Sequence, residues 1–475
     1  MTSAVLILAA GQGKRMKSTL PKVLHSAGGQ PLLFHIFDRI LEAMPDAPIG
    51  LVVGHGRDLV EAAVRAEPRF RRLSIDFIFQ AEQNGTGHAA RCAMESKWGE
   101  KVLREKRNLL VLPGDLPLIT RELLKQVAES MSKKAALRLL TCDLPDPTGY
   151  GRVIRRGKSG SVLRIVEERD TNLRERAIRE VATSIYFFHG QFLRSGLLRL
   201  SNKNAQGEYY LTDLISQASR AKKAIEVLKW QDAEDLRGVN DPWELGIAGQ
   251  ILNRRIVQKH ARNGVLFRDT GAAWIDVTVV IGEGTRVGPG VWLRGDTQVG
   301  KNVDLGANVV LTDANIGDDV EIKHGSVIER SRMGTGSKAG PYAHLRPESD
   351  VGPRAKIGNF VELKKTVIGE GSSVAHLSYL GDANVGARVN IGCGFVTCNF
   401  DGREIDGSRK HKTVIEDDVF MGSDCQAVAP VRIGRGAFVA SGSTITEEVP
   451  SGALAIARSR QVTKLGYAKK LKTQE

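Results

Sequence analysis

The sequence predicts two folds in one chain: an α/β domain with a mostly parallel sheet, followed by a parallel β-helix of six-residue repeats. Two observations carry this prediction. Over about the first 240 residues, short apolar runs alternate with helical segments, and from residue 281 small aliphatic residues recur every six positions. Alternating strands and helices are typical of a parallel sheet covered by helices. A period of six fits neither a helix nor a simple strand and is typical of stacked coils.

The α/β part is predicted from four apolar runs of strand length, separated by segments with helical patterning. In such a sheet, ligands gather at the carboxyl ends of the strands. The runs are 5–8, 50–53, 75–79 and 109–112, and the helical segments are 32–44 and 58–66.

One connecting helix is predicted next, because residues 243 to about 262 contain good helix formers and neither a proline nor a repeat. The lysine-rich tail beyond Gly466 is expected to be mobile. We therefore expect an α/β domain at 1–242, a linker helix at 243–263 and a coil domain with a basic tail at 264–475.

The coil domain is predicted from the register of its aliphatic residues, which scattered Val and Ile in an ordinary sandwich would not hold. Coils are expected from near Trp274 to about Glu447. Steps of five at 311–316, 363–368 and 380–385 tighten single corners without losing the stack. The repeated positions are Ile281, Val287, Leu293, Val299, Leu305, Leu311, Ile316, Ile322, Ile328, Val351, Ile357, Leu363, Ile368, Val374, Leu380, Val385, Ile391, Ile433, Val439 and Ile445.

Composition narrows the class of protein. The chain has 475 residues, 41% of them hydrophobic and 26% charged, which is typical of a globular protein of two or three domains. The first apolar run has no basic segment before it, and no stretch approaches membrane-spanning length. Five cysteines without a C-x-x-C pair predict free thiols in a reducing cytoplasm.

The net charge of +14 allows two interpretations, a nucleic-acid surface or pockets for phosphorylated substrates. Lysines and arginines occur in small groups without interleaved aromatic residues, which are only 5% of the chain. This pattern favours phosphorylated small molecules over nucleic acid.

A glycine-rich segment follows the first apolar run, from Ala9 to Met16, and Pro21-Lys22-Val23 comes shortly after it. A glycine loop lets backbone N–H groups approach a phosphate, and nearby Arg and Lys side chains neutralise its charge. The segment is neither a P-loop nor a dinucleotide fingerprint, so by itself it is equally compatible with a plain glycine turn.

Together with other stretches, this segment resembles the sugar-1-phosphate nucleotidyltransferases. The whole chain is most similar to the bifunctional N-acetylglucosamine-1-phosphate uridyltransferase/glucosamine-1-phosphate acetyltransferases of bacteria. The matching stretches in the first half are Leu8–Lys22, Gln80–Gln83, Gly85–His88, Gly114–Leu118, Asp146–Arg152, Glu208–Asp213 and Gly238–Asn240.

The resemblance implies a Rossmann-like nucleotidyltransferase domain in which the sugar phosphate attacks the α-phosphorus of UTP and pyrophosphate leaves. Arg15 and Lys22 would stabilise the accumulating charge. Asp115 emerges after the buried run 109–112 and would bind Mg²⁺ together with Asn240. The implied UTP contacts are Leu8, Gly11, Lys22, Gln80, Gln83, Gly85 and Thr86, and the implied sugar contacts are Gly151, Glu167, Ala182 and Asn240.

One position departs from the family pattern. Where Asn-Thr-Gly commonly faces the sugar, this chain has Ala182-Thr183-Ser184. Alanine supplies no amide, so we expect weaker or broader sugar selection.

In the second half the resemblance implies an acetyltransferase. His376 would be the general base that takes a proton from the amine of glucosamine-1-phosphate as it attacks acetyl-CoA. His376 lies eighteen residues after Gly358, so one full coil is expected to stack these two positions, with Glu362 as the candidate for orienting the imidazole. The implied sugar-phosphate contacts are Arg346, Lys364, Tyr379, Asn390 and Lys410, and the implied acetyl-CoA contacts are Cys393, Asn399, Phe400, Ser423, Ser441 and Arg458.

This half also departs from the pattern. Phe400 replaces a common Tyr, and the loop 403–412 is several residues longer than usual, which predicts a flexible surface excursion that could shift Lys410. The resemblance further implies a left-handed β-helix that assembles as a homotrimer, with the acetyl site shared between subunits.

Three functions remain open at this point. The first is the bifunctional enzyme of UDP-N-acetylglucosamine synthesis. The second is a nucleotidyltransferase for another sugar-1-phosphate, which Ala182 favours. The third is a non-enzymatic hexapeptide interaction protein, which the presence of Arg15, Lys22, Asp115 and His376 disfavours.

Overall fold

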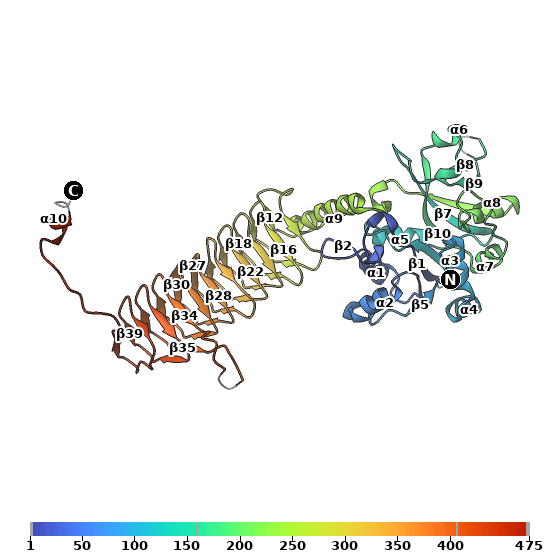
Figure 1. Ribbon diagram of the computed structural model, residues 1–475. Coiled ribbons are helices and arrows are strands. Elements are labelled where there is room, and N and C mark those ends of the chain that lie inside the picture. Colours follow the sequence, from blue (N-terminus) through green and yellow to red (C-terminus); the bar gives the residue numbers. More distant parts are fainter. Residues whose placement is uncertain (1–2, 158–159, 405–406, 472–475) are drawn as a thin grey trace. The chain divides into compact units, whose positions relative to one another are not determined.

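The computed structural model describes residues 3–157, 160–404 and 407–471 (Figure 1). Its packing divides the chain into two compact units, Met1–Leu252 and Asn253–Glu475. The division falls inside helix α9, Pro242–Arg262. The domain limits expected at 242 and 263 stay predictions. In the described part of the chain, no helix is both long and apolar enough to cross a membrane.

The first unit is a mixed sheet in the strand order β11-β7-β10-β6-β1-β4-β5. Strand β10 is antiparallel to its neighbours β6 and β7, and the other pairs on this path are parallel. A mostly parallel sheet is therefore confirmed. The strands are β1 Ser3–Ala9, β4 Ile49–Val53, β5 Ile75–Phe79, β6 Asn108–Pro113, β7 Ala135–Asp143, β10 Glu180–Phe188 and β11 Ala224–Lys229, with β8 Gly151–Arg155 and β9 Val162–Val166 extending the β10 edge and β2 Ser26–Ala27 and β3 Gln30–Pro31 forming a separate hairpin.

Strand β1 shows why the sheet is buried on both faces. Its side chains alternate between two hydrophobic clusters, Leu6 entering one and Val5 and Ile7 the other. Because both faces are covered by helices, the strand is apolar throughout, as parallel strands usually are. The helices of this unit are α1 Leu32–Ala43, α2 Arg57–Ala66, α3 Thr86–Glu95, α4 Lys97–Arg104, α5 Arg121–Val127, α6 Leu173–Arg176, α7 Gly190–Leu197 and α8 Asp213–Arg220.

Helix α9 contributes to both hydrophobic cores. Leu252, near its middle, belongs to a cluster with Leu32 and Leu118, whereas Ile256 and Val257 belong to the core of the coils.

The second unit is a left-handed β-helix, in which three faces of short parallel strands surround one continuous core (Figure 1). The first face holds β12 Leu266–Phe267, β15 Arg286–Val287, β18 Asp304–Leu305, β21 Glu321–Ile322, β24 Lys338–Ala339, β27 Lys356–Asn359, β30 Ser373–His376, β33 Asn390–Ile391, β36 Phe420–Met421, β39 Phe438–Val439 and β41 Leu454–Ala455. The second holds β13 Trp274–Ile275, β16 Trp292–Arg294, β19 Val310–Thr312, β22 Val327–Glu329, β25 His344–Leu345, β28 Glu362–Lys364, β31 Tyr379–Gly381, β34 Val396–Cys398, β37 Gln426–Val428 and β40 Thr444–Ile445. The third holds β14 Val280–Ile281, β17 Gln298–Val299, β20 Asn315–Ile316, β23 Arg332–Met333, β26 Asp350–Val351, β29 Val367–Ile368, β32 Ala383–Val385, β35 Thr413–Ile415 and β38 Val431–Ile433.

All of the predicted six-residue positions are buried in this core. The register also continues where no repeat was predicted, through Met333, Ala339, Leu345, Met421 and Ala427, because the interior accepts a methionine or an alanine as well as a branched residue.

The predicted limits of the coils are wrong. Coils already begin at β12 and extend to β41. Phe267 stands eight positions before Ile275, and Ala455 stands ten positions after Ile445, so a period of six cannot detect the terminal coils. The tail contains a short helix, α10 Tyr467–Leu471, and its expected mobility stays a prediction. Residues 472–475 of the predicted basic tail lie outside the described part.

The expected stacking of His376 on Gly358 is also wrong. Strand β30 pairs with β27 so that Asn359, not Gly358, is the partner of His376. The reason is the step of five at 363–368, which shortens this coil to seventeen residues, whereas the preceding coil pairs Lys338 with Lys356 at a separation of eighteen.

Candidate active sites

The glycine loop in the first unit lies at the carboxyl end of β1. Leu8 pairs with Pro113 of β6, and its carbonyl accepts a hydrogen bond of 2.9 Å from the Gly114 amide. Gly13 has a φ of +61°, and a Cβ there would lie only 2.8 Å from the Cβ of Lys22. A side chain at position 13 would therefore displace Lys22, and glycine is required for both conformation and space.

Lys22, Asp115 and Asn240 meet at this edge of the sheet. The Lys22 ammonium donates to the Asp115 carboxylate, and its Nζ lies 3.5 Å from Asn240 Oδ1. The side chains of Lys22 and Asp115 are 16% and 15% exposed. The 238–240 segment is held against Asp115 by a 3.0 Å bond from the Val239 amide to the Asp115 carbonyl. The two predicted metal ligands are thus adjacent, and a lysine ammonium is the cation between them.

Two other predicted residues of the loop are open to ligand. Gly11 has no other atom within 4 Å of an added Cβ. Arg15 is exposed in a 3-10 helix, Lys14–Met16, and within the described residues it has no hydrogen-bond or ion-pair partner. Both remain available to an incoming phosphate.

The predicted base-binding residues form one connected turn. The Gln80 amide nitrogen lies 3.3 Å from the Gly85 carbonyl and 3.1 Å from His88 Nδ1, so this buried side chain holds the turn. Gly85 has a φ of +95°, and an added Cβ would lie 2.7 Å from the Tyr209 carbonyl. The Thr86 hydroxyl accepts from the Leu211 amide at 3.1 Å. The 208–213 motif therefore supports the turn from the side.

Gln83, the other predicted glutamine, lies close to Gly54, which also approaches Ala10 of the glycine loop. An added Cβ at Gly54, which follows β4, would lie 3.1 Å from the Gln83 Nε2 atom and 2.6 Å from the Ala10 carbonyl. Glycine at position 54 therefore lets the base-binding turn and the phosphate loop approach each other closely.

Three of the four predicted sugar residues, Gly151, Glu167 and Ala182, meet at strands β8, β9 and β10, whereas Asn240 lies beside Lys22. Ala182 pairs with Gly151, and an added Cβ at Gly151 would lie 3.4 Å from Glu167 Oε2. Thr212 donates a 2.9 Å bond to Glu167 Oε1. Burial raises the pKa of the Glu167 carboxyl, and the Thr212 bond partly opposes this shift. Thr212 lies within the stretch Glu208–Asp213 that the resemblance covers, but the motif alone does not predict its bond to Glu167.

Ala182 ends the regular part of β10. The pairing with β7 shifts between Ala182 and Tyr186, and Ser184 in this irregular stretch is exposed with a φ of +59°. Ala182 itself is 4% exposed. The departure from the family pattern thus lies at the start of an irregular stretch, next to Gly151. There the buried methyl group of Ala182 stands in place of an asparagine amide.

In the second unit, a polar cluster occupies one face of the β-helix. Arg346 donates a 2.9 Å hydrogen bond to Glu362 Oε1. This bond raises the pKa of the Arg346 guanidinium, and the weaker effect of desolvation opposes the shift. Glu362 pairs with Tyr379 on the next coil, and Lys364 pairs with Gly381. Four of the predicted residues therefore share the second face.

His376 lies at the end of β30 on the first face, beside the corner that leads to this cluster. Its Nδ1 atom is 2.6 Å from the Asn359 Oδ1 atom. Glu362, the predicted orienting residue, instead pairs with Arg346. The structure therefore does not support Glu362 as the orienting residue, because the shortened coil places an amide at the imidazole.

Four of the six predicted acetyl-CoA residues continue the column of His376, and the other two, Asn399 and Phe400, lie at the start of the lengthened loop. Register pairs Ser373 with Asn390, Ile391 with Met421 and Met421 with Val439. Cys393, Ser423 and Ser441 each stand two positions after Ile391, Met421 and Val439, respectively. The Ser423 amide donates to Ser441 Oγ at 3.2 Å, and the Asp424 amide donates to the Cys393 carbonyl at 2.7 Å. In order along the column stand Asn359, His376, Cys393, Ser423 and Ser441, with Arg458 against Gly442 at its end.

The lengthened loop brings Lys410 to Phe400. Strand β32 pairs with β35 thirty positions later, and the described residues between, 399–404 and 407–412, lie outside the named strands of the coil. The Lys410 ammonium lies 4.3 Å from the centre of the Phe400 ring, and the Asn399 side chain donates to Asp382 at 2.5 Å. His411, at the base of this loop, is buried, and its Nε2 atom lies 3.3 Å from Asp401 Oδ1. A cation–π contact thus joins the two departures that we noted in the sequence.

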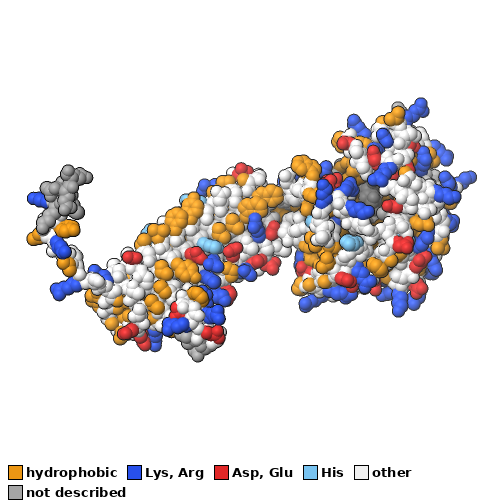
Figure 2. All heavy atoms as spheres, in the orientation of Figure 1, with side chains coloured by type: hydrophobic (Ala, Val, Ile, Leu, Met, Phe, Trp, Pro, Cys, Tyr) orange, Lys and Arg blue, Asp and Glu red, His pale blue; other side chains and the backbone are white. Residues whose placement is uncertain are grey.

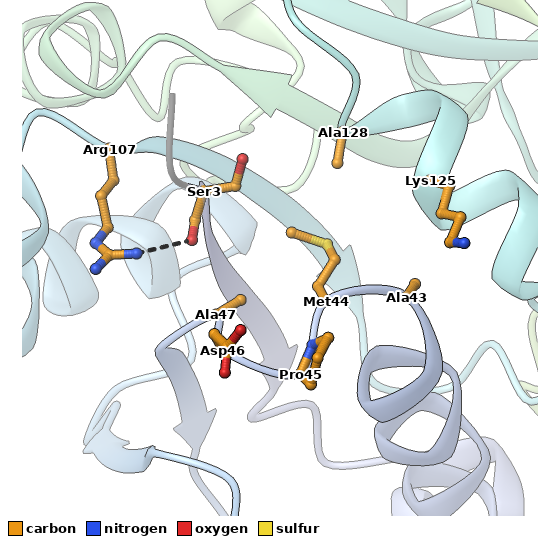
Figure 3. Close-up of a pocket in the computed structure, with 9 residues that line it drawn as sticks. All are labelled: Ser3, Ala43, Met44, Pro45, Asp46, Ala47, Arg107, Lys125 and Ala128. Carbon is orange, nitrogen blue, oxygen red and sulfur yellow. Dashed lines mark hydrogen bonds between the residues drawn. The ribbon is translucent and has the colours of Figure 1, made fainter.

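A surface pocket of about 360 Å³ lies in the first unit (Figure 3). Ser3 begins β1, Arg107 precedes β6 and Ala47 precedes β4, so the pocket is at the amino ends of parallel strands. The glycine loop is at their carboxyl ends. This pocket is therefore not the nucleotide site.

Known proteins match both units. Residues 5–164 match the MobA-like NTP transferase domain, residues 278–313 the bacterial transferase hexapeptide repeat, and residues 412–447 the hexapeptide repeat of succinyl-transferase.

Full-length relatives named bifunctional protein GlmU match the chain from end to end. The one from Clostridioides difficile is 42% identical over 99% of this chain and 98% of its own length. Those from Shouchella clausii and Trichlorobacter lovleyi are 43% and 44% identical, each over 98% of both chains. Since these matches cover both units, the chain belongs to the bifunctional GlmU family of transferases.

Proposed function

We propose that this chain catalyses two steps of UDP-N-acetylglucosamine synthesis. One is the acetylation of glucosamine-1-phosphate by acetyl-CoA, and the other is the transfer of UMP from UTP to N-acetylglucosamine-1-phosphate with release of pyrophosphate. The observation that carries the proposal is that full-length identity to the GlmU relatives coincides with two clusters of polar residues, one in each unit.

The uridylyl site needs no protein nucleophile. The sugar phosphate oxygen forms a bond to the α-phosphorus as the bond to pyrophosphate breaks. We assign the phosphates to the glycine loop, Arg15 and Lys22, and the uracil to the turn held by Gln80. Fixed positive charge around a phosphoryl centre stabilises the charge that accumulates there.

Magnesium fits the residues at the edge of β6. Asp115 and Asn240 offer one carboxylate and one amide oxygen, and the Lys22 ammonium shows that this pair already binds a cation. Among the described residues there is no cluster of three or more His, Cys, Asp or Glu side chains that could hold a metal. Mg²⁺ commonly takes one or two protein oxygens and completes its shell with phosphates and water, where it neutralises their charge. Asp115 and Asn240 would hold it.

The acetyl site is assigned to the corner between the first and second faces. The amine of glucosamine-1-phosphate forms a C–N bond to the thioester carbonyl, the C–S bond breaks, and coenzyme A leaves as the thiol. His376 removes the proton from the nitrogen. Arg346, Lys364 and Lys410 would neutralise the sugar phosphate, with Tyr379 and Asn390 against the sugar, and acetyl-CoA would lie along the column from Cys393.

We assign the working form to a homotrimer in the cytoplasm. Aromatic side chains form exposed ladders on the coils, with Tyr342 stacked on Phe360 at 5.5 Å between ring centres and Phe420 on Phe438 at 4.6 Å. Figure 2 shows rows of apolar side chains along the β-helix. Such rows mark contact surfaces, and a second copy of the chain is the occupant expected for a hexapeptide transferase. The free cysteines fit a reducing compartment.

One assay tests the proposal. The chain is supplied with glucosamine-1-phosphate, acetyl-CoA, UTP and Mg²⁺, and free thiol and pyrophosphate are followed separately. We expect both products, with pyrophosphate release depending on prior acetylation. Pyrophosphate without thiol would leave only the nucleotidyltransferase, and neither product would support the interaction protein instead. Light scattering of the same sample tests for three copies.

A further inference from the structure

We propose that Asn359 is a positioning residue for acetyl transfer, because it fixes the tautomer of His376. The inference rests on the proposed function of His376 as the general base. It replaces the carboxylate partner that we expected from the sequence with a neutral amide.

The backbone holds the two side chains in register. Asn359 ends β27 and His376 ends β30, and these residues are paired across the two strands. The Leu377 amide donates to the Asn359 carbonyl at 3.0 Å, and the Ser378 hydroxyl donates to the His376 carbonyl at 2.7 Å. Both sides of the corner are therefore fixed, so the 2.6 Å contact between the side chains follows from the coil geometry.

The contact determines where the imidazole proton lies. Asn359 faces the ring with Oδ1, and an amide oxygen can only accept. His376 must then carry its proton on Nδ1, which leaves the lone pair of Nε2 free. A neutral imidazole with a free Nε2 is the form that can remove a proton from the substrate amine.

The partner of the ring is also uncharged, because Asn359 is an amide. On the strands that flank His376, the titratable groups are Lys356 at the far end of β27 and the Cys393 thiol after β33. Arg346, Glu362 and Lys364 lie on the second face, and Glu362 is paired with Arg346. An amide therefore orients the ring without placing a charge beside it.

Three variants test the inference in the full-length chain: Asn359→Ala, Asn359→Asp and, as a matched control, Asn315→Asp. Asn315 is exposed on β20 of the third face and receives the same change of charge away from His376. The rate of thiol release at saturating substrate is measured from about pH 5 to 9. The nitrogen resonances of His376, identified by comparison with His376→Ala, report which ring nitrogen carries the proton.

We expect Asn359→Ala to lower kcat by roughly 10–100-fold with a smaller change in KM, the size typical of groups that orient a functional histidine. Asn359→Asp keeps an acceptor at the ring, so it should retain more activity than the alanine variant. Its carboxylate should move the acid limb of the profile to higher pH by about one unit, since a nearby opposite charge favours imidazolium. Asn315→Asp should change neither.

The outcomes separate this inference from the proposed function. If His376→Ala acetylates normally, the base assignment fails and the inference fails with it. If His376→Ala is inactive but the limb of Asn359→Asp does not move, or wild-type His376 carries its proton on Nε2, only the Asn359 role is overturned. Should Asn359→Ala fail to fold, as judged by a changed size in light scattering, the limb and the tautomer in the other variants still decide.

Discussion

Lys22→Met should strengthen the binding of a divalent cation to the chain in the absence of nucleotide. In the structure the Lys22 ammonium bonds to the Asp115 carboxylate and approaches Asn240 Oδ1. These two groups supply the oxygens that we assign to the metal. An ammonium and a metal ion cannot occupy the same position. Methionine keeps the length and apolar stem of the lysine but removes the competing charge, so the oxygens become free.

The magnitude can be bounded from the burial of the pair. The two side chains are 16% and 15% exposed, so water screens them only in part. An exposed ion pair is worth up to about 1 kcal/mol. Two unit charges about 4 Å apart near a surface interact with about 4 kcal/mol. Desolvation of the two charges offsets most of the larger interaction energy. We therefore expect the affinity for the divalent cation to rise on the order of tenfold, which corresponds to about 1.4 kcal/mol.

Binding of Mn²⁺, followed by its electron paramagnetic resonance signal without substrate, measures this directly. Lys14→Met is the matched control, because Lys14 lies on the same loop and, within the described residues, has no contact with Asp115. It removes the same charge without freeing the oxygens and should change the affinity less. Equal affinities of wild type and Lys22→Met would refute the competition. Unchanged Mn²⁺ binding by Asp115→Ala would refute the metal site itself.

Three further substitutions test the assignments. Asp115→Ala should abolish uridylyl transfer and leave acetyl transfer nearly intact, since the two sites belong to separate cores; pyrophosphate release near the wild-type rate would contradict this. Ala182→Asn should increase the preference for N-acetylglucosamine-1-phosphate over glucose-1-phosphate, because an amide is restored beside the sugar residues, and a strong wild-type preference that asparagine does not increase would dispose of the idea. His376→Ala should lose on the order of 10²–10⁴-fold in acetyl transfer, with uridylyl transfer from supplied N-acetylglucosamine-1-phosphate and trimer size unchanged; parallel loss of both activities would indicate a structural role.

The sequence was sufficient to predict elements whose pattern is determined locally. Strand β5 has the predicted limits, and α1 ends one residue before the predicted end, because apolar runs and helical periodicity are properties of neighbouring residues. Strands β8, β9 and β10 were not predicted. The pairing of β8 with β10 joins residues about 30 positions apart, as between Arg152 and Val181, and no local pattern encodes such a partner.

The candidate sites were predictable to different depths. Residue identities came from motifs, and the structure brings Gly151, Glu167 and Ala182 together as the motifs imply. Partners within a site were not predictable in this way. That Thr212 bonds to Glu167, or that Lys410 lies over Phe400, depends on side-chain conformations and on loop paths that a motif does not specify.

The β-helix is an exception, because its long-range contacts are encoded by counting. Each coil returns to the same corner after eighteen residues, or after seventeen where a step of five occurs, so the partner of any position can be computed once the steps are located. The step between Leu363 and Ile368 is visible in the sequence and lies between Asn359 and His376. Counting it selects Asn359 rather than Gly358 as the neighbour of the imidazole, and the same count places Cys393 next. The rule fails at the terminal coils, where β12 pairs with β15 twenty positions later and β39 pairs with β41 sixteen positions later, and at the coil in which Ala383 pairs with Thr413 thirty positions later. In this family of folds, an active-site column is therefore a property of the repeat, and a single five-residue step upstream of the base is enough to change which side chain orients it.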